Sequence, residues 1–327
     1  MSKLGSNINS GLGVELGSMT NATRNAGVST ATGTVIYNST ESVVQVYSGT
    51  GWDTLSNVFS ASGGTLDTTG RSGYNVHKFT SPGSFIVEGR PGTVEVLILG
   101  GGGAGGSGNN QGYESGGGGA GALYYNTSMD LAIGSYPVTV GGGGSGQPDA
   151  NGSNGTPSTF NGKTGTGGGG GAEGGNSGNP GGCGGGGAHP ATGGGTATGA
   201  SGGSDNANSP DAGWGRNGGP GLASRGGGGG GIGAVGTTSP TQGGPGGAGL
   251  SFSITGSSLA KGGGGGGAWN GQGGAGGGGN CNPGLNNLTG MTAGNSESGG
   301  GGGAAYSSTG QSGANGGSGV VIIAYQS

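Results

Sequence analysis

Runs of four to six consecutive glycines recur after residue 99, and they restrict the possible folds of this chain more than any other feature. The longest are Gly226–Gly231 and Gly262–Gly267. Collagen is excluded, because glycine does not occupy every third position and proline is scarce. A left-handed three-fold helix directs its backbone N–H and C=O groups outward, and helices without Cβ atoms can approach closely enough to exchange those hydrogen bonds. We therefore predict a polyglycine II helix bundle, with a flexible linker as the alternative.

Composition limits the function classes. Only 7% of the 327 residues are charged and the net charge is −4, which argues against nucleic acid or an anionic membrane as partner. The high charge typical of disordered chains is also lacking. The longest apolar stretches are too short to cross a bilayer, so no membrane insertion is predicted, and the first residues lack the apolar core of a signal peptide.

The cysteines and histidines do not form a recognisable metal motif. Cys183 and Cys281 lie far apart, and His77 and His189 show no ligand spacing. The sequence predicts no metal site and no cofactor. It leaves open whether the two cysteines form a disulfide.

Strand patterns are concentrated near the two ends of the chain. Residues 33–38 and 42–49 are rich in β-branched and aromatic residues and predict a hairpin, followed by a third short element. Further short strand patterns with turn residues between them predict a β-sandwich. These patterns cover residues 76–80, 84–89, 93–100, 121–126 and 136–141, with 158–164 as a further candidate.

The last strand pattern, residues 318–327, contains the continuous apolar run Val320–Ile323. Such a run would be an aggregation hazard in water. We expect it to pair with residues 93–100, whose apolar character is typical of a strand buried on both faces. The glycine-rich body is then an insertion closed at both ends by strands.

The predicted fold class is therefore mainly β, with little or no α-helix. We expect three parts: an N-terminal attachment region with the hairpin, a β-sandwich completed by the C-terminal strand, and a polyglycine II bundle with displayed loops. Their predicted bounds are residues 1–57, 58–142 with 318–327, and 143–317.

The segments between the glycine runs are polar, with scattered aromatic residues. Asn, Ser, Gly, Tyr and Trp also dominate antibody binding loops, in which rigid aromatics supply contact area and short polar groups adapt to a ligand. The alternative is that these segments are plain turns. The candidate binding residues are Tyr113, Trp214, Arg216, Trp269, Asn270, Asn286, Asn287 and Tyr306.

Catalytic motifs are not convincing. GxGxxG matches arise by chance in this composition, and Gly199–Gly203 fits G-x-S-x-G without a strand–turn–helix context. We predict that the protein is not an enzyme and has no catalytic residues.

Two parts of the chain resemble bacteriophage structural proteins. Residues 33–56, "GTVIYNSTESVVQVYSGTGWDTLS", resemble a segment recurrent in phage tail and virion proteins. Residues 79–106 together with the terminal "GGSGVVIIAY" resemble the glycine-rich domain of phage fibre proteins. Glycine runs alternating with polar loops are similar to the receptor-binding adhesins at the long-tail-fibre tips of T-even-like phages, although the N-terminal region differs from theirs.

The resemblance implies a virion fibre or tail-tip protein that recognises the host cell through loops on a polyglycine II sandwich. Its expected partners are other tail or baseplate proteins, bound through the N-terminal region, and a host surface glycan or outer-membrane protein. A homotrimer is left open. The alternatives are a purely structural virion component and a glycine-rich bacterial or extracellular matrix protein, the latter disfavoured by the lack of an export signal.

Overall fold

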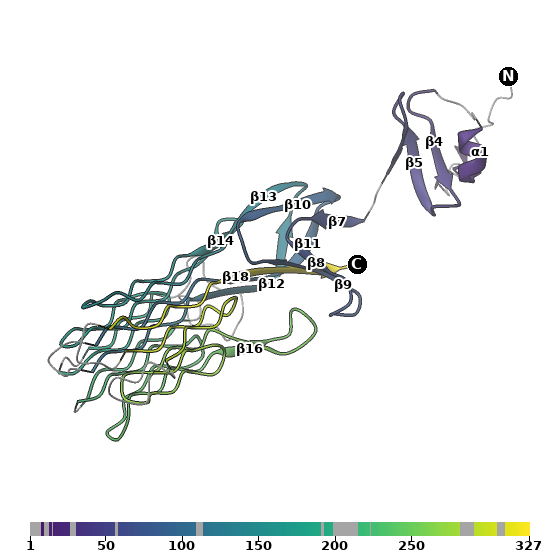
Figure 1. The fold of residues 1–327 in the computed structure, drawn as a ribbon. Coiled ribbons are helices and arrows are strands. Elements are labelled where there is room, and N and C mark those ends of the chain that lie inside the picture. Colours follow the sequence, from purple (N-terminus) through teal and green to yellow (C-terminus); the bar gives the residue numbers. More distant parts are fainter. Residues whose placement is uncertain are drawn as a thin grey trace. The chain divides into compact units, whose positions relative to one another are not determined.

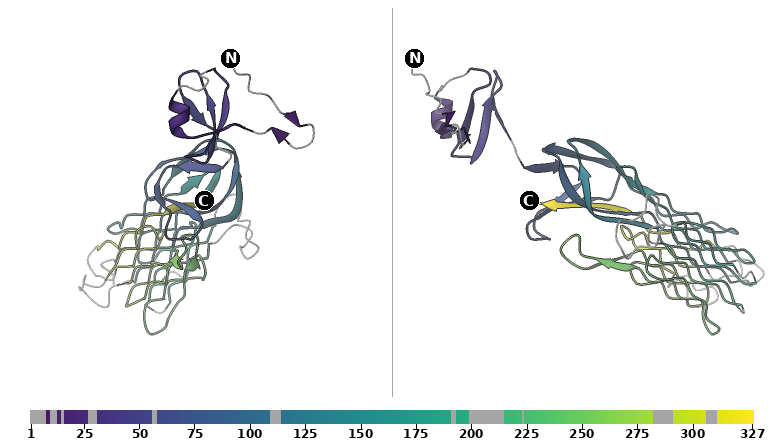
Figure 2. Two further views of the ribbon diagram at one scale, coloured as in Figure 1. Left: turned by 90° about the vertical axis from the view of Figure 1, so that its right-hand side faces the viewer. Right: turned by 180° about the vertical axis from the view of Figure 1, so that it is seen from behind.

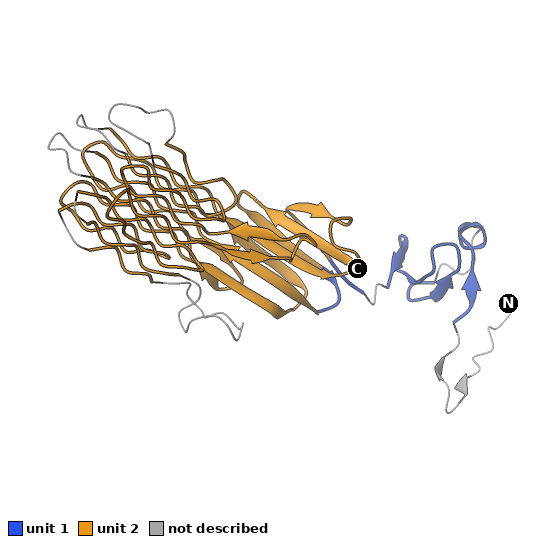
Figure 3. Cartoon of the chain, turned by 90° about the horizontal axis from the view of Figure 1, so that it is seen from below, with its two compact units in different colours: residues 1–60, 88–91 blue, residues 61–87, 92–327 orange. Residues whose placement is uncertain are grey.

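The computed structural model describes residues 16–26, 31–55, 58–108, 114–190, 193–198, 215–222, 224–281, 291–305 and 311–327, and the strand backbone at 8–9 and 13–14. The chain divides into two compact units, residues 1–60 with 88–91 and residues 61–87 with 92–327 (Figure 3). The predicted fold class is confirmed, since 30% of the chain is strand and 2% is helix. Within the described residues, no helix has the length and apolar character needed to cross a membrane.

The first unit contains a four-stranded sheet in the order β3-β4-β5-β6. The predicted hairpin and third element are confirmed, because β4 pairs antiparallel with β5 and β5 with β6. β3 adds a parallel strand that the sequence analysis did not predict. The bounds in this unit are β1 Ile8–Asn9, β2 Gly13–Val14, β3 Ser18–Met19, α1 Asn21–Asn25, β4 Val35–Asn38, β5 Val43–Tyr47 and β6 Trp52–Thr54.

A buried polar network holds the short helix α1 on this sheet. Asn38 and Gln45 are almost completely buried, and Asn38 Nδ2 donates to Gln45 Oε1 at 2.9 Å. The same nitrogen donates to Asn21 Oδ1 at 2.6 Å, and Arg24 Nη1 donates to Gln45 Oε1 at 2.7 Å. Because buried polar groups are costly without partners, this network fixes the helix position although no α1 residue is buried.

The second unit begins with a β-sandwich of two five-stranded sheets, in the orders β15-β14-β13-β10-β7 and β12-β11-β18-β9-β8 (Figure 1). The candidate strand at 158–164 supplies β14 and β15 of the first sheet. The bounds are β7 Phe59–Ser62, β8 Thr65–Asp67, β9 Tyr74–Phe79, β10 Gly83–Gly89, β11 Gly92–Leu99, β12 Leu123–Leu131, β13 Gly134–Thr139, β14 Ser158–Phe160, β15 Lys163–Gly165 and β18 Val320–Gln326.

The C-terminal strand β18 completes the second sheet, as predicted. It lies between β11 and β9 and pairs antiparallel with both, with Val96 opposite Ile323 and His77 opposite the same residue. Val320–Ile323 are each at most 1% exposed. The sheet therefore connects the two ends of the glycine-rich insertion.

The two sheets pack through an aromatic core. His77 of β9 meets the edge of Phe85 of β10 with ring centroids 5.2 Å apart, and Phe85 meets Phe160 at 6.0 Å. His77 Nδ1 lies 2.7 Å from the carbonyl of Gly63, and its ring stacks on Tyr325. Burial lowers the pKa of His77, so this imidazole is a neutral core residue.

The other face of the β11–β18 sheet is also covered. A hairpin of β16 Leu250–Phe252 and β17 Leu259–Lys261 packs Phe252 and Ile254 against that face, together with Ile232. This segment falls within the predicted bundle 143–317, and no strand was predicted for it. Its signal was the alternation of Leu250, Phe252 and Ile254, which is typical of a half-buried strand.

The glycine runs form a hydrogen-bonded lattice beside the sandwich (Figures 1 and 2). Along residues 100–108, every third N–H donates to the same neighbouring run, over distances of 2.8–3.3 Å. Residues 100, 103 and 106 donate to 122, 119 and 116; residues 101, 104 and 107 to 156, 153 and 150; residues 102, 105 and 108 to 317, 314 and 311. This period of three is that of a three-fold helix, so the predicted polyglycine II bundle is confirmed.

Residues 115–122 form a central run of this lattice. Their N–H groups donate to three neighbouring runs and their carbonyls accept from three others, which makes six neighbours. The N–H groups donate to residues 166–172, 227–230 and 299–302. The carbonyls accept from residues 100–106, 183–186 and 265–268. Backbone hydrogen bonds thus replace the side-chain core of an ordinary domain.

The lattice explains the glycines directly. A Cβ added to Gly118 would lie 2.2 Å from the carbonyl oxygen of Gly103, far inside contact distance. The lattice is nevertheless not free of interior Cβ atoms. Ala120 packs beside Cys183, and Ala268 and Ala304 pack beside Cys281, all nearly or completely buried. Small side chains are accommodated where they meet each other between runs.

Candidate functional site

Two ends of the lattice are distinguished by the hydrogen-bond register. At the sandwich end lie Gly100, Ala122 and Gly319, next to strands β11, β12 and β18. At the opposite end, which we call the far end, lie Gly108 and Gln311, joined by a hydrogen bond of 3.1 Å. Among the residues that the structure describes, no strand covers the far end (Figure 1).

Trp269 and Asn270 form a tight turn at the far end, directly after the run Gly262–Ala268. Both residues have left-handed backbone, with φ of 76° and 63°. The turn is closed by a hydrogen bond from Gly271 N to Gly267 O at 3.1 Å, and Gly243 N donates to Trp269 O at 2.6 Å. Trp269 is half-buried and Asn270 is exposed.

The thiol of Cys281 stabilises this turn by hydrogen bonds to its backbone. Its sulfur accepts hydrogen bonds from the backbone N–H groups of Asn270, Trp269 and Gly271. Burial raises the pKa of the thiol to about 12, so it is a protonated packing residue. Cys183, buried in another cluster, also has a pKa raised to about 12 by burial, and no disulfide joins the two.

Glu114 and Arg225 complete a cluster around Trp269. The Arg225 guanidinium lies over the indole ring, 4.2 Å from its centroid, within cation–π range. Arg225 Nη1 also lies 3.9 Å from Glu114 Oε1, and the Glu114 side chain is only 3% exposed. We call Glu114, Arg225, Trp269 and Cys281 the tip cluster.

Glu114 is a strained ionisable group within the tip cluster. Its Oε2 is buried without a hydrogen-bond partner, as is Arg225 Nε. Burial raises the pKa of Glu114 to about 8, against the opposing effect of Arg225. The Glu114 carboxyl group therefore titrates close to neutral pH, whereas an exposed carboxyl group titrates near about pH 4.

The pH dependence of stability tests this assignment. Glu114→Gln is expected to match the wild type near pH 4 and to exceed it in free energy of unfolding by about 2 kcal/mol at pH 9. The folded state holds a proton that the unfolded chain loses above its ordinary pKa of 4.5, so the wild type loses stability as the pH rises from there to about 8. The gain is below that full shift, because solvent near the partly exposed Arg225 screens the charge of the carboxylate. Urea unfolding between pH 4 and 9 measures it.

The exposed carboxylate Glu88, changed to Gln, is the control for that titration. A Glu114→Gln variant whose stability runs parallel to the wild type over the whole pH range would contradict the raised pKa. A stabilisation confined to low pH would contradict its direction.

The structure places the predicted site residues unevenly. Trp269 and Asn270 are together at the far end, whereas Arg216 is nearer the sandwich, where its carbonyl accepts from Gly184 N at 3.0 Å. Its guanidinium donates back to the carbonyl of Gly215. The other five candidates lie outside the described residues: Tyr113, Trp214, Asn286, Asn287 and Tyr306.

Sequence reasoning missed Glu114 and Arg225. Each is a charged residue at the far-end boundary of a glycine run, Glu114 just before the central run and Arg225 directly before Gly226–Gly231. A charge at such a boundary in a chain with 7% charged residues was the available signal. Among the described side chains, no group of three or more His, Cys, Asp or Glu is arranged to hold a metal ion.

The fold thus defines a class: a β-sandwich whose C-terminal strand closes an inserted polyglycine II lattice. The family model of the glycine-rich domain matches residues 79–326. The chain belongs to this glycine-rich domain family. Comparison with curated proteins finds no match.

Proposed function

We propose that this protein is a bacteriophage fibre or tail-tip protein that recognises the host cell surface through the far end of its lattice. One observation carries the proposal: a rigid backbone lattice brings residues from distant parts of the chain into one small tip cluster. Glu114, Arg225 and Trp269 come from three different runs that are hydrogen-bonded neighbours. Recognition sites are typically built on loops that a rigid scaffold positions.

The chemistry of the tip suits a glycan or an outer-membrane protein. Trp269 supplies a rigid aromatic surface, Arg225 a guanidinium and Asn270 an exposed amide. Aromatic residues and arginine are the side chains most enriched in binding hot spots. The left-handed backbone at Trp269 and Asn270 further supports a binding role, since strained conformations cluster at functional sites.

The proposed attachment partners are other tail or baseplate proteins, bound by the N-terminal region 1–57. This proposal is supported by the separate first unit, which has its own sheet and polar network. The resulting location is the virion, with no catalytic activity in the proposed role.

Adsorption to bacterial cells tests the proposal. Trp269→Ala is expected to weaken binding to cells that the wild-type protein labels by about 2 kcal/mol, roughly thirtyfold in Kd, as a hot-spot aromatic does. Alanine bears the same left-handed backbone cost as the tryptophan, so the lost cation–π contact should reduce stability by only about 1 kcal/mol. Labelled protein titrated onto cells gives Kd, and urea unfolding gives stability.

Val235→Ala is the control, because Val235 is 51% exposed and lies in the turn after Ile232, at the sandwich end. Unchanged adsorption in Trp269→Ala and in variants of Tyr113, Trp214 and Tyr306 would replace the adhesin proposal by a purely structural virion role. One observation favours that second candidate: Arg225 of the chain itself covers a face of the Trp269 ring.

A further inference from the structure

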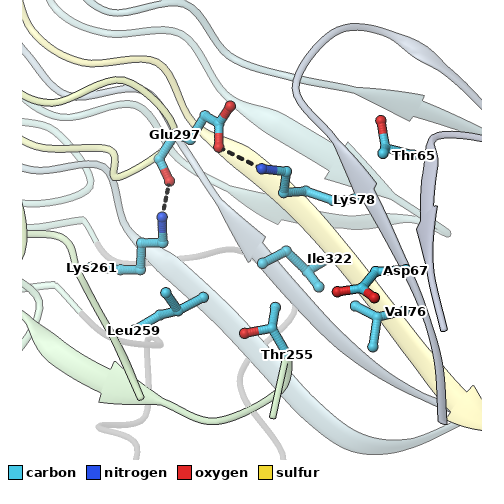
Figure 4. Close-up of a pocket in the computed structure, with 9 residues that line it drawn as sticks. All are labelled: Thr65, Asp67, Val76, Lys78, Thr255, Leu259, Lys261, Glu297 and Ile322. Carbon is cyan, nitrogen blue, oxygen red and sulfur yellow. Dashed lines mark hydrogen bonds and ion pairs between the residues drawn. The ribbon is translucent and has the colours of Figure 1, made fainter. Parts of the chain in front are cut away.

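A second site lies at the sandwich end, under the β16–β17 hairpin. A pocket of about 370 Å³ separates this hairpin from the outer face of strands β8, β9 and β18 (Figure 4). This volume is within the range of small-molecule sites. The pocket is lined by Thr65, Asp67, Val76, Lys78, Thr255, Leu259, Lys261, Glu297 and Ile322.

The pocket is held open by packing on its flank. Phe252 packs on Tyr125 with ring centroids 5.2 Å apart, and Ile254 is 1% exposed in the core cluster. Arg71 Nη1 donates to the carbonyl of Ile254 at 3.3 Å and also pairs with Glu95 of β11. The hairpin is therefore fixed on the sheet, and the pocket does not depend on a ligand to form.

One wall of the pocket carries two lysines and a single carboxylate. Lys78 Nζ lies 2.9 Å from Glu297 Oε2, and Lys261 Nζ donates to the Glu297 backbone carbonyl at 2.6 Å. Each ammonium group has three N–H donors, so both keep donors beyond these bonds. The two ammonium groups and the one carboxylate leave this wall with one excess positive charge, and Asp67 brings a second carboxylate to the other side of the pocket.

The placement of Lys261 is unfavourable for the protein alone. Burial lowers its pKa, Glu297 opposes this shift and Lys78 adds to it. A partly buried ammonium without a full counter-charge costs stability. A bound anion would supply that missing charge.

The remaining surfaces favour a hydroxylated ligand. Val76 and Ile322 form a buried apolar floor at 2% and 1% exposure. Asp67 lines the other side, and hydrogen bonds from the backbone of Thr69 and Gly70 lower its pKa, so it is an ionised acceptor. Thr255 Oγ1 is buried without a hydrogen-bond partner.

We infer that this pocket binds an acidic monosaccharide, with its carboxylate at Lys78 and Lys261 and hydroxyl groups at Asp67 and Thr255. The apolar C–H face of the sugar lies on Val76 and Ile322. A simple fatty acid would leave the buried Thr255 hydroxyl without a partner and would bring no donor to Asp67. A neutral sugar would leave the charge of the lysine wall unmatched. This site is separate from the tip cluster.

Calorimetric titration of the full chain tests the inference, with glucuronate and galacturonate as probes. Glucose, galactose, hexanoate and sulfate are the comparison ligands. At least one uronate is expected to bind tenfold or more tightly than its neutral counterpart and than hexanoate or sulfate. Equal binding of uronate and neutral sugar, tighter binding of hexanoate or sulfate, or no binding at all would overturn it.

Variants locate the site. Lys261→Met should weaken uronate binding at least tenfold, while Lys163→Met, outside the pocket, should not change it. Glu297→Gln should strengthen binding several-fold, because it removes the carboxylate that competes for Lys78. Loss of uronate binding in Glu297→Gln would contradict the site. Unchanged uronate binding in Lys261→Met, with folding shown to be intact by circular dichroism, would also contradict it. Trp269→Ala should leave uronate affinity unchanged, which separates this test from that of the proposed function.

Discussion

Gly264→Ala is expected to destabilise the second unit by about 3 kcal/mol, the upper end of the usual cost of overpacking. The added methyl carbon would lie 2.1 Å from the carbonyl oxygen of Gly229 and 2.6 Å from its carbonyl carbon. Both are backbone atoms of a neighbouring run, so no side chain can rotate away. Relief requires the runs 226–231 and 262–267 to separate, which breaks the hydrogen bond from Gly229 N to Gly265 O. Gly264→Val should be worse still.

Gly142→Ala is the matched control for this substitution. Gly142 belongs to a glycine run and bonds to Thr156, but it is exposed, and an added Cβ meets nothing closer than 3.9 Å. Alanine there should leave stability unchanged or raise it by about 0.5 kcal/mol through a less flexible unfolded chain. Urea unfolding and amide exchange within 262–267 measure both variants. Equal stability of the two alanine variants would refute the lattice at that run.

Removal of residues 319–327 is expected to prevent folding of the second unit. The deletion removes four fully buried side chains, Val320–Ile323, each contributing about 1.5–3 kcal/mol. It also leaves β11 and β9 with unpaired edges inside the sheet. The summed loss is of the order of the whole stability of a typical domain. Expression in the insoluble fraction and loss of a cooperative thermal transition are the measured results.

Two smaller changes to β18 should have smaller effects on stability than the full deletion. Removal of Gln326–Ser327, which are exposed, should have little effect. Ile323→Ala should reduce stability by about 2–5 kcal/mol while retaining the fold. A truncation at 319 that stays soluble and melts at the wild-type temperature would rule out a structural role for β18.

Much of this fold could be predicted from the sequence because its signals are local. The apolar run Val320–Ile323 required burial on both faces, and the glycine runs required a lattice without side chains. The strands β4 and β5 were visible from their β-branched residues. Helix α1 was not, because it is five residues long and its position depends on polar contacts with Asn38 and Gln45 from distant strands.

The candidate site could be predicted only in part, for a physical reason. Every glycine run offers the same backbone donors and acceptors, so the sequence does not say which runs become neighbours. The proximity of Glu114, Arg225 and Trp269 depends on that choice. The end of the lattice at which a segment lies depends on how many runs precede it, since each run crosses the lattice from one end to the other. The position of Arg216 nearer the sandwich is not visible in the sequence, because short crossings such as residues 193–198 contain few consecutive glycines.

The three-residue period of the lattice sets different rules for insertions at its two kinds of position. Within a run, adding or removing one residue turns every following N–H by a third of a turn and aims it at the wrong neighbour. Three residues together restore the pattern and lengthen the run by one layer, about 9 Å. At a far-end turn such as Trp269–Asn270 no such count applies, because the register is set by the runs on either side. Length changes in steps of three within a run therefore keep the register, and whole turns can be exchanged between runs without altering it.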